Sequence, residues 1–395
     1  MKPRSNIKHV LLAPSWYPDQ RLPHNGTFFR EQAQMLKNAG YKVGVVAIDA
    51  PLLPLRWDLC LKITEEDGIT VIRSKLPQVM WQGLPGDATI ARVLSRRALR
   101  KYEELCGKPD IVHAHSVFPG IYTAQTASKL WNVPYVLTEH RPSSLDRPIN
   151  SGRGRSIAKA VRNANGRAVV SSPFGELLAK YYGVDDWRVI ALPVLESQSE
   201  QPLPKREPDQ PFTFCHVSHW DSNKRVELTV RAFAKALTEK PNIHLTLIGG
   251  TGKAMEGIKD LRSELGLTKE ITLIPRQPRE EIARLMSQAH AFVLASEVEA
   301  GGTVFAEAQM GGLPCIGTRT FAGEFMIEDE TGIRVPIDDE TALAEAMVTL
   351  AEDDHHDYNP EIIRQRAQER FSEQTFVKAC SALYEEALID FQNEC

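Results

Sequence analysis

Short apolar runs rich in β-branched residues alternate along this chain with longer segments whose apolar residues recur at helical spacing. This alternation predicts parallel sheets built from βαβ units, because two parallel strands need a crossover segment between them. In the first half we expect strands at 9–13, 42–48, 69–73, 110–115, 135–140, 166–171 and 188–193. In the second half we expect strands at 212–218, 243–250, 271–275, 291–296, 313–318 and 332–336. The pattern therefore predicts two doubly wound α/β sheets.

A break in this pattern separates the two series of strands. Residues 196–210 are polar, proline-rich and without periodicity, which is typical of an exposed linker. We therefore expect an N-terminal Rossmann-like domain at 1–195 and a second Rossmann-like domain at 211–372. Residues 373–395 carry apolar residues at helical spacing, which predicts a C-terminal helix that can cross back to the N-terminal domain.

Composition narrows the class of protein. With 395 residues and 42% hydrophobic content, the chain is long enough to build two cores. The 47 Lys and Arg against 51 Asp and Glu give no reason to expect a nucleic-acid partner. The six cysteines have no metal-binding spacing and predict reduced thiols in a cytoplasmic protein. No apolar run approaches the roughly 20 residues of a membrane span, so membrane contact would be peripheral.

The segment after the strand predicted at 291–296 carries the clearest chemistry. Ligands of open parallel sheets bind beyond the carboxyl ends of the strands, and here EVEAGGTVFAEAQMGG leads from such an end into a helix. We place Glu299 and Gly302 at the strand end and Glu307 about two turns into the helix. The helix N-terminus suits a diphosphate, with Glu299 near a sugar and Glu307 near ribose hydroxyls. The spacing alone fits a donor site no better than the alternative, in which Glu299 is a solvated loop carboxylate and Glu307, with Gly311 and Gly312, only shapes the helix.

This segment, EAGGTVFAEAQMGGLPCIGT, resembles the signature of the family-4 retaining glycosyltransferases, and Glu299 and Glu307 match its two glutamates. The resemblance extends over nearly the whole chain, through residues 14–46 and the segments PDIVHAH, VPYVLTEH, VSHWDSNKRVELTVRAFAKAL and LIGGTGK. It implies the GT-B architecture, in which two Rossmann-like domains face a cleft.

The resemblance also implies roles for individual residues. His140 and Glu299 are implied to be catalytic, with His115 supporting or on the acceptor side. The residues implied to bind the donor are Gly26, Thr27, His219, Lys224, Gly250, Gly302, Thr303, Val304 and Glu307. Taken singly, a histidine at a strand end is more often a hydrogen-bonded structural residue, so it is the resemblance that favours a catalytic role for His140 and a supporting one for His115.

The chain departs from the family pattern at three places. His219 stands where the family usually has an arginine, so the cation there is weaker and depends on pH. Residues 192–194, Leu-Pro-Val, replace an Asn-Gly pair before the crossover between domains. Thr320 and Phe321 replace a Gly-Gly pair, and these changes bear on the affinity and identity of the donor.

Two other segments have suggestive residue types. EDDHHD at 352–357 contains possible metal ligands, but its polar surroundings favour a solvated loop, and the family needs no metal. The segment 91–105 carries Arg92, Arg96, Arg97, Arg100 and Lys101 beside a helical apolar stripe. Such a face is either simply solvated or a contact with anionic lipid at the inner face of the cytoplasmic membrane.

The sequence therefore predicts a retaining, metal-independent glycosyltransferase without a resident cofactor. It would move a hexose-type sugar from a nucleoside-diphosphate sugar to a hydroxyl of a lipid-linked or polysaccharide precursor. One alternative is a nucleotide-sugar epimerase of the same architecture. Another is a degenerate, non-catalytic partner that binds sugar nucleotides.

Overall fold

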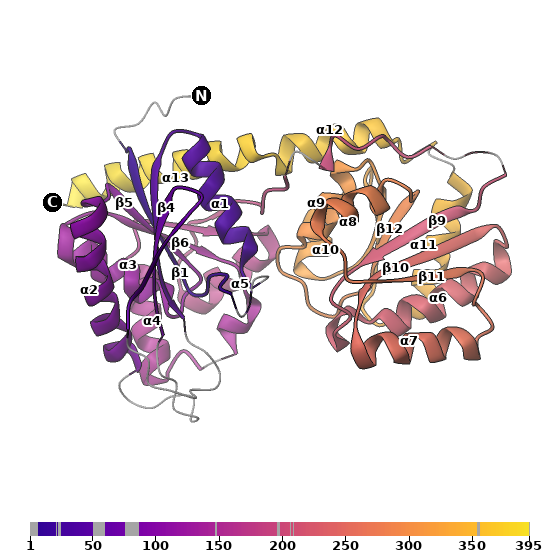
Figure 1. Ribbon diagram of the computed structural model, residues 1–395, viewed down its shortest axis with the longest axis horizontal. Helices are drawn as coiled ribbons and strands as arrows, with labels where there is room; N and C mark the ends of the chain where they lie inside the picture. The colour runs from indigo at the N-terminus through magenta and orange to yellow at the C-terminus, as the bar shows by residue number, and fades with distance from the viewer. Residues whose placement is uncertain are drawn as a thin grey trace. The chain divides into compact units, whose positions relative to one another are not determined.

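The computed structural model describes residues 7–20, 22, 25–49, 60–75, 87–146, 148–195, 198–205, 207, 209–353 and 356–394. The chain divides into two compact units (Figure 1). Unit 1 comprises Met1–Ile190 together with Phe376–Cys395, and unit 2 comprises Ala191–Thr375. Each unit contains one sheet of its own.

Unit 1 is built on a sheet of eight strands in the order β3-β4-β2-β1-β5-β6-β7-β8. Its strands are β1 (His9–Pro14), β2 (Lys42–Asp49), β3 (Lys62–Glu66), β4 (Ile69–Lys75), β5 (Ile111–His115), β6 (Tyr135–Glu139), β7 (Gly166–Val169) and β8 (Trp187–Val189). All neighbouring strands are parallel except β3 and β4. The central strands β1, β5 and β6 are buried along their whole length, as parallel strands covered on both faces must be.

The edge strand β3 was missed by the reading of the sequence. It pairs antiparallel with β4 through a two-residue turn at Asp67 and Gly68, which have φ angles of 51° and 69°. An Asp-Gly pair with positive φ at both positions is the turn that closes a tight hairpin. The signal was present in the sequence, but the polar run KITEE does not alternate like a half-buried strand.

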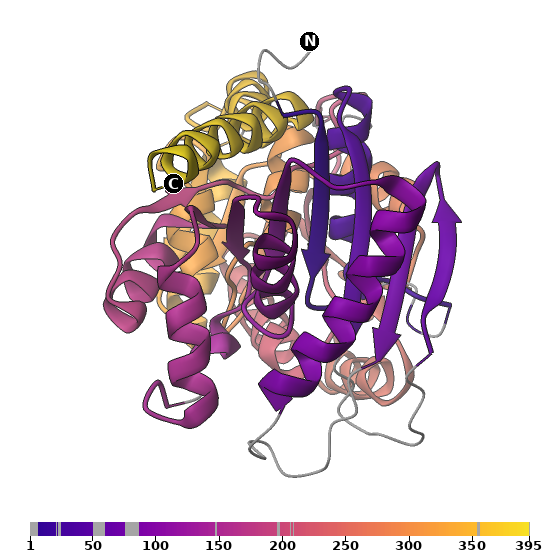
Figure 2. The same cartoon turned by 90° about the vertical axis from the view of Figure 1, so that its left-hand side faces the viewer.

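Helices cover both faces of the unit 1 sheet. They are α1 (Thr27–Asn38), α2 (Asp87–Cys106), α3 (Gly120–Trp131), α4 (Gly152–Arg162), α5 (Ser172–Tyr182) and α13 (Glu373–Glu394), with a short 3-10 helix η1 (Pro142–Leu145). On one face lie α2, whose Tyr102 contacts His9, and α3 (Figure 2). On the other face, α13 places Tyr384 against His113 and α1 places Phe29 against His115. The second face therefore covers a row of buried histidines.

Unit 2 contains a sheet of six parallel strands in the order β11-β10-β9-β12-β13-β14. The strands are β9 (Phe212–Val217), β10 (Ile243–Gly250), β11 (Ile271–Pro275), β12 (Ala291–Leu294), β13 (Cys315–Thr318) and β14 (Gly332–Val335). The direction in which strands are added reverses between β9 and β12. From β9 the chain continues to β10 on one side of the sheet, and from β12 it continues to β13 on the other side. Such a reversal is where open α/β sheets bind ligands.

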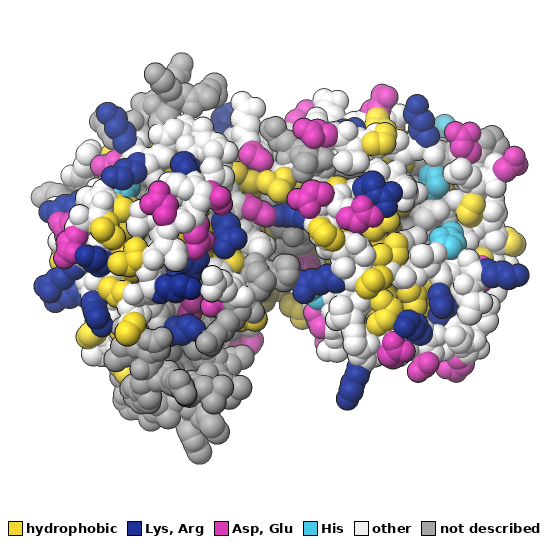
Figure 3. Space-filling view, in the orientation of Figure 1, with side chains coloured by type: hydrophobic (Ala, Val, Ile, Leu, Met, Phe, Trp, Pro, Cys, Tyr) yellow, Lys and Arg dark blue, Asp and Glu magenta, His cyan; other side chains and the backbone are white. Residues whose placement is uncertain are grey.

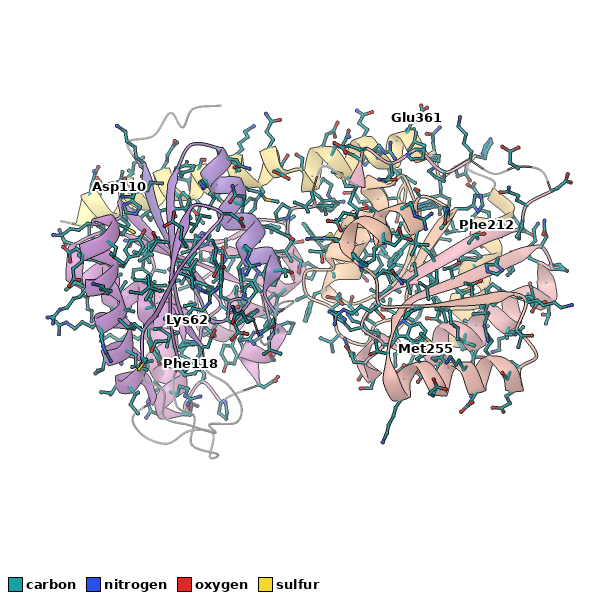
Figure 4. The ribbon with its side chains drawn as sticks, viewed as in Figure 1. Lys62, Asp110, Phe118, Phe212, Met255 and Glu361 are labelled. Carbon is teal, nitrogen blue, oxygen red and sulfur yellow. The ribbon has the colours of Figure 1, made fainter. Side chains whose placement is uncertain are left out.

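The helices of unit 2 pack against its sheet and form two apolar cores with it. They are α6 (Val226–Glu239), α7 (Gly252–Glu264), α8 (Arg279–Met286), α9 (Thr303–Met310), α10 (Phe321–Met326), α11 (Glu340–Asp353) and α12 (Pro360–Phe371), with a 3-10 helix η3 (Ser222–Lys224). One core joins β9 to α6, α7 and α11 and includes Phe212 and Met255, both labelled in Figure 4. The other joins the sheet to α9, α10 and α12 around Phe292 and Phe305.

The boundary between the units lies five residues before the one predicted at residue 195. Val194 belongs to the second core of unit 2, and its backbone N–H donates to Phe371 O at 2.9 Å. Within the predicted linker, Gln198 is buried at 3% exposure, so that segment is not exposed throughout its described part. At the other end of the chain, α13 begins at Glu373, and its residues from Phe376 onward belong to unit 1.

None of the described helices is both long and apolar enough to cross a membrane. Among the described residues, Cys60, Cys106, Cys215, Cys315 and Cys380 form no disulfide, and Cys395 lies outside the described residues.

Candidate active site

The loop from β12 to α9 is shaped by a glycine. Gly302 caps the N-terminus of α9 in the left-handed region, with φ 55°, and no side chain caps this helix end. A Cβ at Gly302 would lie 2.7 Å from Ala322 Cβ, so a larger residue meets both backbone strain and a clash. The N-cap residue therefore offers no side-chain acceptor to the first N–H groups of α9, at Thr303 and Val304, which lie at the positive end of the helix dipole.

Glu299 lies in this loop and is held from two sides. Its backbone carbonyl accepts from Ala322 N at 2.9 Å, and its Oε2 accepts from Lys224 Nζ at 2.5 Å. The side chains of Glu299 and Lys224 are about one-fifth exposed. The structure thus brings together two residues that are 75 positions apart in the sequence and that the resemblance assigned separately.

Asn223 ties the same loop to η3 and was not recognised in the sequence. Its Nδ2 donates to Val298 O at 3.0 Å, while its Oδ1 accepts from Val298 N at 2.8 Å. Its backbone carbonyl accepts from Glu297 N at 2.9 Å. Asn223 therefore supplies three hydrogen bonds to residues just before Glu299 and fixes the loop in which Glu299 lies.

Glu307 lies in α9, but not where the spacing placed it. Because α9 begins at Thr303, Glu307 is just over one turn into the helix rather than two. Its Oε1 accepts from Arg279 at 2.8 Å, and its side chain is 11% exposed. Arg279 was also missed. The sequence does contain one indication of its role, because Arg279 is a cation at the first position of α8, where the helix dipole disfavours positive charge.

The other residues of unit 2 that were predicted to bind the donor lie around the ends of β9 and β10. Trp220 is buried beneath Gly250, where a Cβ would lie 2.2 Å from the indole ring, so this position requires glycine. His219 is exposed. Lys224 is the last residue of η3. Burial, with the charge of Lys224, lowers the pKa of His216 on β9 to about 3, so its imidazole is neutral at physiological pH.

The remaining predicted residues lie in unit 1, at the carboxyl edge of its sheet. Gly26, with φ 82°, caps α1, and a Cβ there would lie 2.8 Å from Trp16 Cδ1; Thr27 is the first residue of the helix. His115 Nδ1 and His140 Nε2 are 3.1 Å apart, and both rings contact Phe29. The predicted site residues therefore form two groups, one in each unit.

Two features singled out in the sequence have local structural explanations. Thr320, which replaces a family glycine, caps α10 by accepting from Gly323 N at 3.1 Å. In the EDDHHD segment, the carboxylate of Asp353 accepts from the backbone N–H groups of Asp357 and Tyr358. Ligand-type side chains of Asp353, His356 and Asp357 lie close together there, with His356 and Asp357 exposed. A solvated loop remains the prediction for this segment.

Comparison with known proteins identifies the family of this chain. Two family profiles match consecutive parts of the chain: "Glycosyltransferase Family 4" over residues 26–194 and "Glycosyl transferases group 1" over residues 197–370. The chain is 26% identical over 329 residues to N-acetyl-alpha-D-glucosaminyl L-malate synthase of Bacillus anthracis, covering 80% of this chain and 83% of that protein.

Solved structures agree at the level of the fold. Sucrose-phosphate synthase from Thermosynechococcus elongatus matches with a TM-score of 0.69 at 19% identity, over 96% of this chain and 98% of that one. The Anabaena protein HepE in complex with UDP matches with a TM-score of 0.69 at 15% identity, over 95% and 99% of the two chains. The architecture is therefore GT-B, as the sequence predicted. The chain belongs to the group 1 glycosyltransferases of the family-4 type.

Gly302→Ala is expected to lower the free energy of unfolding of unit 2 by about 1–3 kcal/mol, through left-handed strain and the contact with Ala322. Gly257→Ala in α7 is the matched control, since a Cβ there meets nothing within 4 Å. It should stabilise the helix by about 0.5–1 kcal/mol. Thermal unfolding of both variants measures the difference. Equal stability of Gly302→Ala and the parent would contradict the role given to this glycine.

Proposed function

We propose that this protein is a retaining glycosyltransferase that moves a hexose-type sugar from a nucleoside-diphosphate sugar to a hydroxyl of a lipid-linked or polysaccharide precursor. The observation that carries the proposal is the uncapped N-terminus of α9, with the Glu299–Lys224 pair and Glu307 close by in sequence and structure. This arrangement offers a diphosphate both backbone N–H groups and a cation. It also offers carboxylates to sugar and ribose hydroxyls.

In this proposal the chemistry is electrostatic. The departing diphosphate oxygen takes the acceptor proton on the same face of the sugar, so no side chain need act as a general base. The protein stabilises charge on the diphosphate and on the oxocarbenium-like sugar with groups already in place. Lys224 is held by Glu299 in the structure, so an incoming diphosphate would share its ammonium with that carboxylate.

The acceptor and the donor base are inferred only as classes. The malate synthase relative is named for a product that joins a glucosaminyl group to a hydroxy acid, which supports a hydroxyl acceptor. The HepE structure is described with UDP, which supports a nucleoside-diphosphate donor. The names of these relatives favour transfer over the epimerase alternative.

The two glutamates are expected to fail in different ways. Glu307→Ala should mainly raise the donor KM, by roughly tenfold to a hundredfold, because a charged hydrogen-bond acceptor to ribose acts in the ground and transition states alike. Glu299→Gln should instead lower kcat and leave nucleotide affinity nearly unchanged, because its contacts strengthen as positive charge develops on the sugar. Steady-state kinetics and titration with nucleoside diphosphate separate these effects.

Glu345→Gln, on the exposed face of α11, is the control for a change of charge in unit 2. It should alter neither constant. Near-normal turnover by Glu299→Gln would show that this loop is not the donor site. Unchanged nucleoside-diphosphate binding by Glu307→Ala would show the same.

Transfer is expected to need no divalent metal, because Lys224 and the N-terminus of α9 supply positive charge to the diphosphate. Activity should be the same in EDTA as in magnesium. The measurement is product formation with each donor in both buffers after removal of metal by gel filtration. Inactivation by EDTA that added magnesium reverses would contradict this prediction.

We also infer peripheral contact with anionic lipid through α2. Figure 3 shows Lys and Arg side chains over the side of unit 1 that carries this helix. Arg96, Arg97 and Arg100 are exposed, and Val93 beside them is 63% exposed. Arg92, which the sequence included in this set, instead turns inward and donates to Ser156 Oγ at 3.1 Å. An exposed apolar side chain among arginines suits the boundary between lipid head groups and acyl chains.

Replacing Arg96, Arg97 and Arg100 by Glu should lower binding to vesicles rich in phosphatidylglycerol by at least tenfold at low salt, since each basic residue contributes about 1 kcal/mol near an anionic surface. The control replaces the exposed Lys253 and Lys259 of α7 by Glu, which should change binding little. Sedimentation with anionic and neutral vesicles provides the measurement. Equal sedimentation of the parent with both kinds of vesicle would contradict the inference.

A further inference from the structure

Unit 1 has its own reversal of strand order, which lies between β1 and β5. From β1 the chain continues to β2 on one side of the sheet, whereas β5 and β6 lie on the other side. Trp16 comes two residues after the end of β1, and Arg141 comes two residues after the end of β6. Both residues therefore lie at the carboxyl edge of the sheet, on the part of it where open α/β sheets bind ligands.

The guanidinium group of Arg141 lies over the indole ring of Trp16. Its Cζ is 3.8 Å from the ring centroid, which is well within the range of a cation–π contact. The indole is held in turn by α1, because it contacts the ring of Phe29 at a centroid distance of 5.0 Å and leaves no room for a Cβ at Gly26. Trp16 is therefore a fixed support for the cation.

The backbone of Arg141 is fixed as well. Its N–H donates to Glu139 Oε1 at 2.9 Å, and its carbonyl accepts from Ser144 Oγ at 2.7 Å. A long side chain on the surface normally loses rotamer entropy when it binds a ligand. Because both the main chain and the guanidinium of Arg141 already have contacts that hold them, this loss is smaller here.

The N–H groups of the Arg141 guanidinium have no acceptor among the residues that the structure describes, and no described carboxylate forms an ion pair with it. Glu139 is buried and accepts from the backbone N–H groups of Val117, His140 and Arg141 instead. Stacking covers one face of a guanidinium but leaves the N–H groups along its edges free to donate. Arg141 is also exposed, so these edges are open to a ligand from solution.

We propose that Arg141, supported by Trp16, binds an oxyanion of the acceptor, so that the protein selects acceptors with a phosphate or carboxylate over neutral ones. Two parallel N–H groups of a guanidinium match two oxygens of either anion. The assignment to the acceptor rests on the proposed function, in which Lys224 and the N-terminus of α9 in unit 2 already supply positive charge to the donor diphosphate. The anion site itself does not rest on it.

The first test measures binding by the full chain without turnover. Titrations followed by saturation-transfer difference NMR at low salt compare glucose 6-phosphate with glucose, and glucuronate with glucuronamide. We expect the parent to bind the acidic member of at least one pair at least tenfold more tightly than its neutral partner, because hydrogen bonds to a charged group are worth about 1.5–3 kcal/mol. The preferred pair identifies the anion as a phosphate or a carboxylate. Equal binding within both pairs would overturn the proposal.

Substitutions of Arg141 test whether this residue binds the anion. Arg141→Gln should weaken binding of the acidic probe by roughly tenfold to a hundredfold and leave binding of the neutral probe unchanged. Arg141→Lys should lie between the two, because it keeps the charge but loses the paired N–H groups. Lys180→Gln, at an exposed position of α5, makes the same change of charge in unit 1 and should bind like the parent. Equal binding of the acidic probe by Arg141→Gln and the parent would overturn the proposal.

Substitutions of Trp16 test the support. Trp16→Leu should weaken binding of the acidic probe by about two- to fivefold, since it removes a cation–π contact at an exposed site. Trp16→Phe keeps an aromatic face and should come closer to the parent. Thermal unfolding of both variants shows whether α1 still packs in place. If Trp16→Leu is folded and binds the probe as tightly as the parent does, Trp16 has no part in the site.

Titration with UDP and GDP distinguishes the acceptor from the donor. Arg141→Gln should bind the nucleoside diphosphate as tightly as the parent does, while its KM for an acidic acceptor rises. An equal loss of affinity for nucleoside diphosphate and for the acidic probe would assign Arg141 to the donor and overturn its assignment to the acceptor. If binding of the acidic probe depends on Arg141 but no sugar is transferred, the proposed function fails and the anion site stands.

Discussion

The hydrogen bonds that join η3 to the loop after β12 fix Lys224 and Glu299 relative to each other, at the loop that leads into α9. β9 and β12 are neighbours at the point where strand order reverses, so their carboxyl ends release two loops side by side. Asn223 binds one loop to the other with three hydrogen bonds, and Lys224 adds a charged contact to Glu299. Because Glu299 O in turn accepts from Ala322 N, the loop is bonded both to η3 and to α10. The position of the N-terminus of α9, which directly follows this loop, depends on these hydrogen bonds.

In unit 1, polar side chains are buried at the carboxyl edge of the sheet and need hydrogen-bond partners there. Glu139 is buried and accepts from the backbone N–H groups of Val117, His140 and Arg141. Burial raises the pKa of Glu139, and those three hydrogen bonds act against that rise. The same carboxylate also fixes the backbone at His140, so the ring of His140 starts from an immobile main chain.

Much of the fold could be predicted from the sequence, because β-branched runs and helical spacing are local signals. Strands such as β1, β2 and β10 were placed within one residue of their observed ends. The edge strand β3 was missed because its residues do not alternate, and only the Asp67-Gly68 pair marks it. The structure divides into units at Ile190 rather than at residue 195, because Val194 packs onto residues of unit 2 that are far away in the sequence. Contacts between residues far apart in the sequence produce no periodic pattern of apolar residues, so they cannot be predicted from such a pattern.

The candidate site shows the same division between local and long-range information. Glu299, Gly302 and Glu307 could be found from one segment, since a strand end, a glycine and a helix start follow each other there. Asn223 could not, because its role consists of contacts with a residue 75 positions away. Arg279 is marked in the sequence only as a cation at the start of α8, and its contact with Glu307, 28 positions away, is not. The pairing of Lys224 with Glu299 likewise exists only once β9 and β12 are neighbours.

The Arg279–Glu307 pair illustrates how a carboxylate can be kept ready for a neutral ligand. Glu307 is nearly buried on a helix, and an isolated charge in such a place would be expensive to desolvate. Arg279 meets this cost by occupying Oε1, and among the described residues no group bonds to Oε2. A ribose hydroxyl that donated to Oε2 would therefore find a carboxylate that is already oriented and partly neutralised. A hydrogen bond of this kind would be directional, and its formation would not require the desolvation of an unpaired carboxylate.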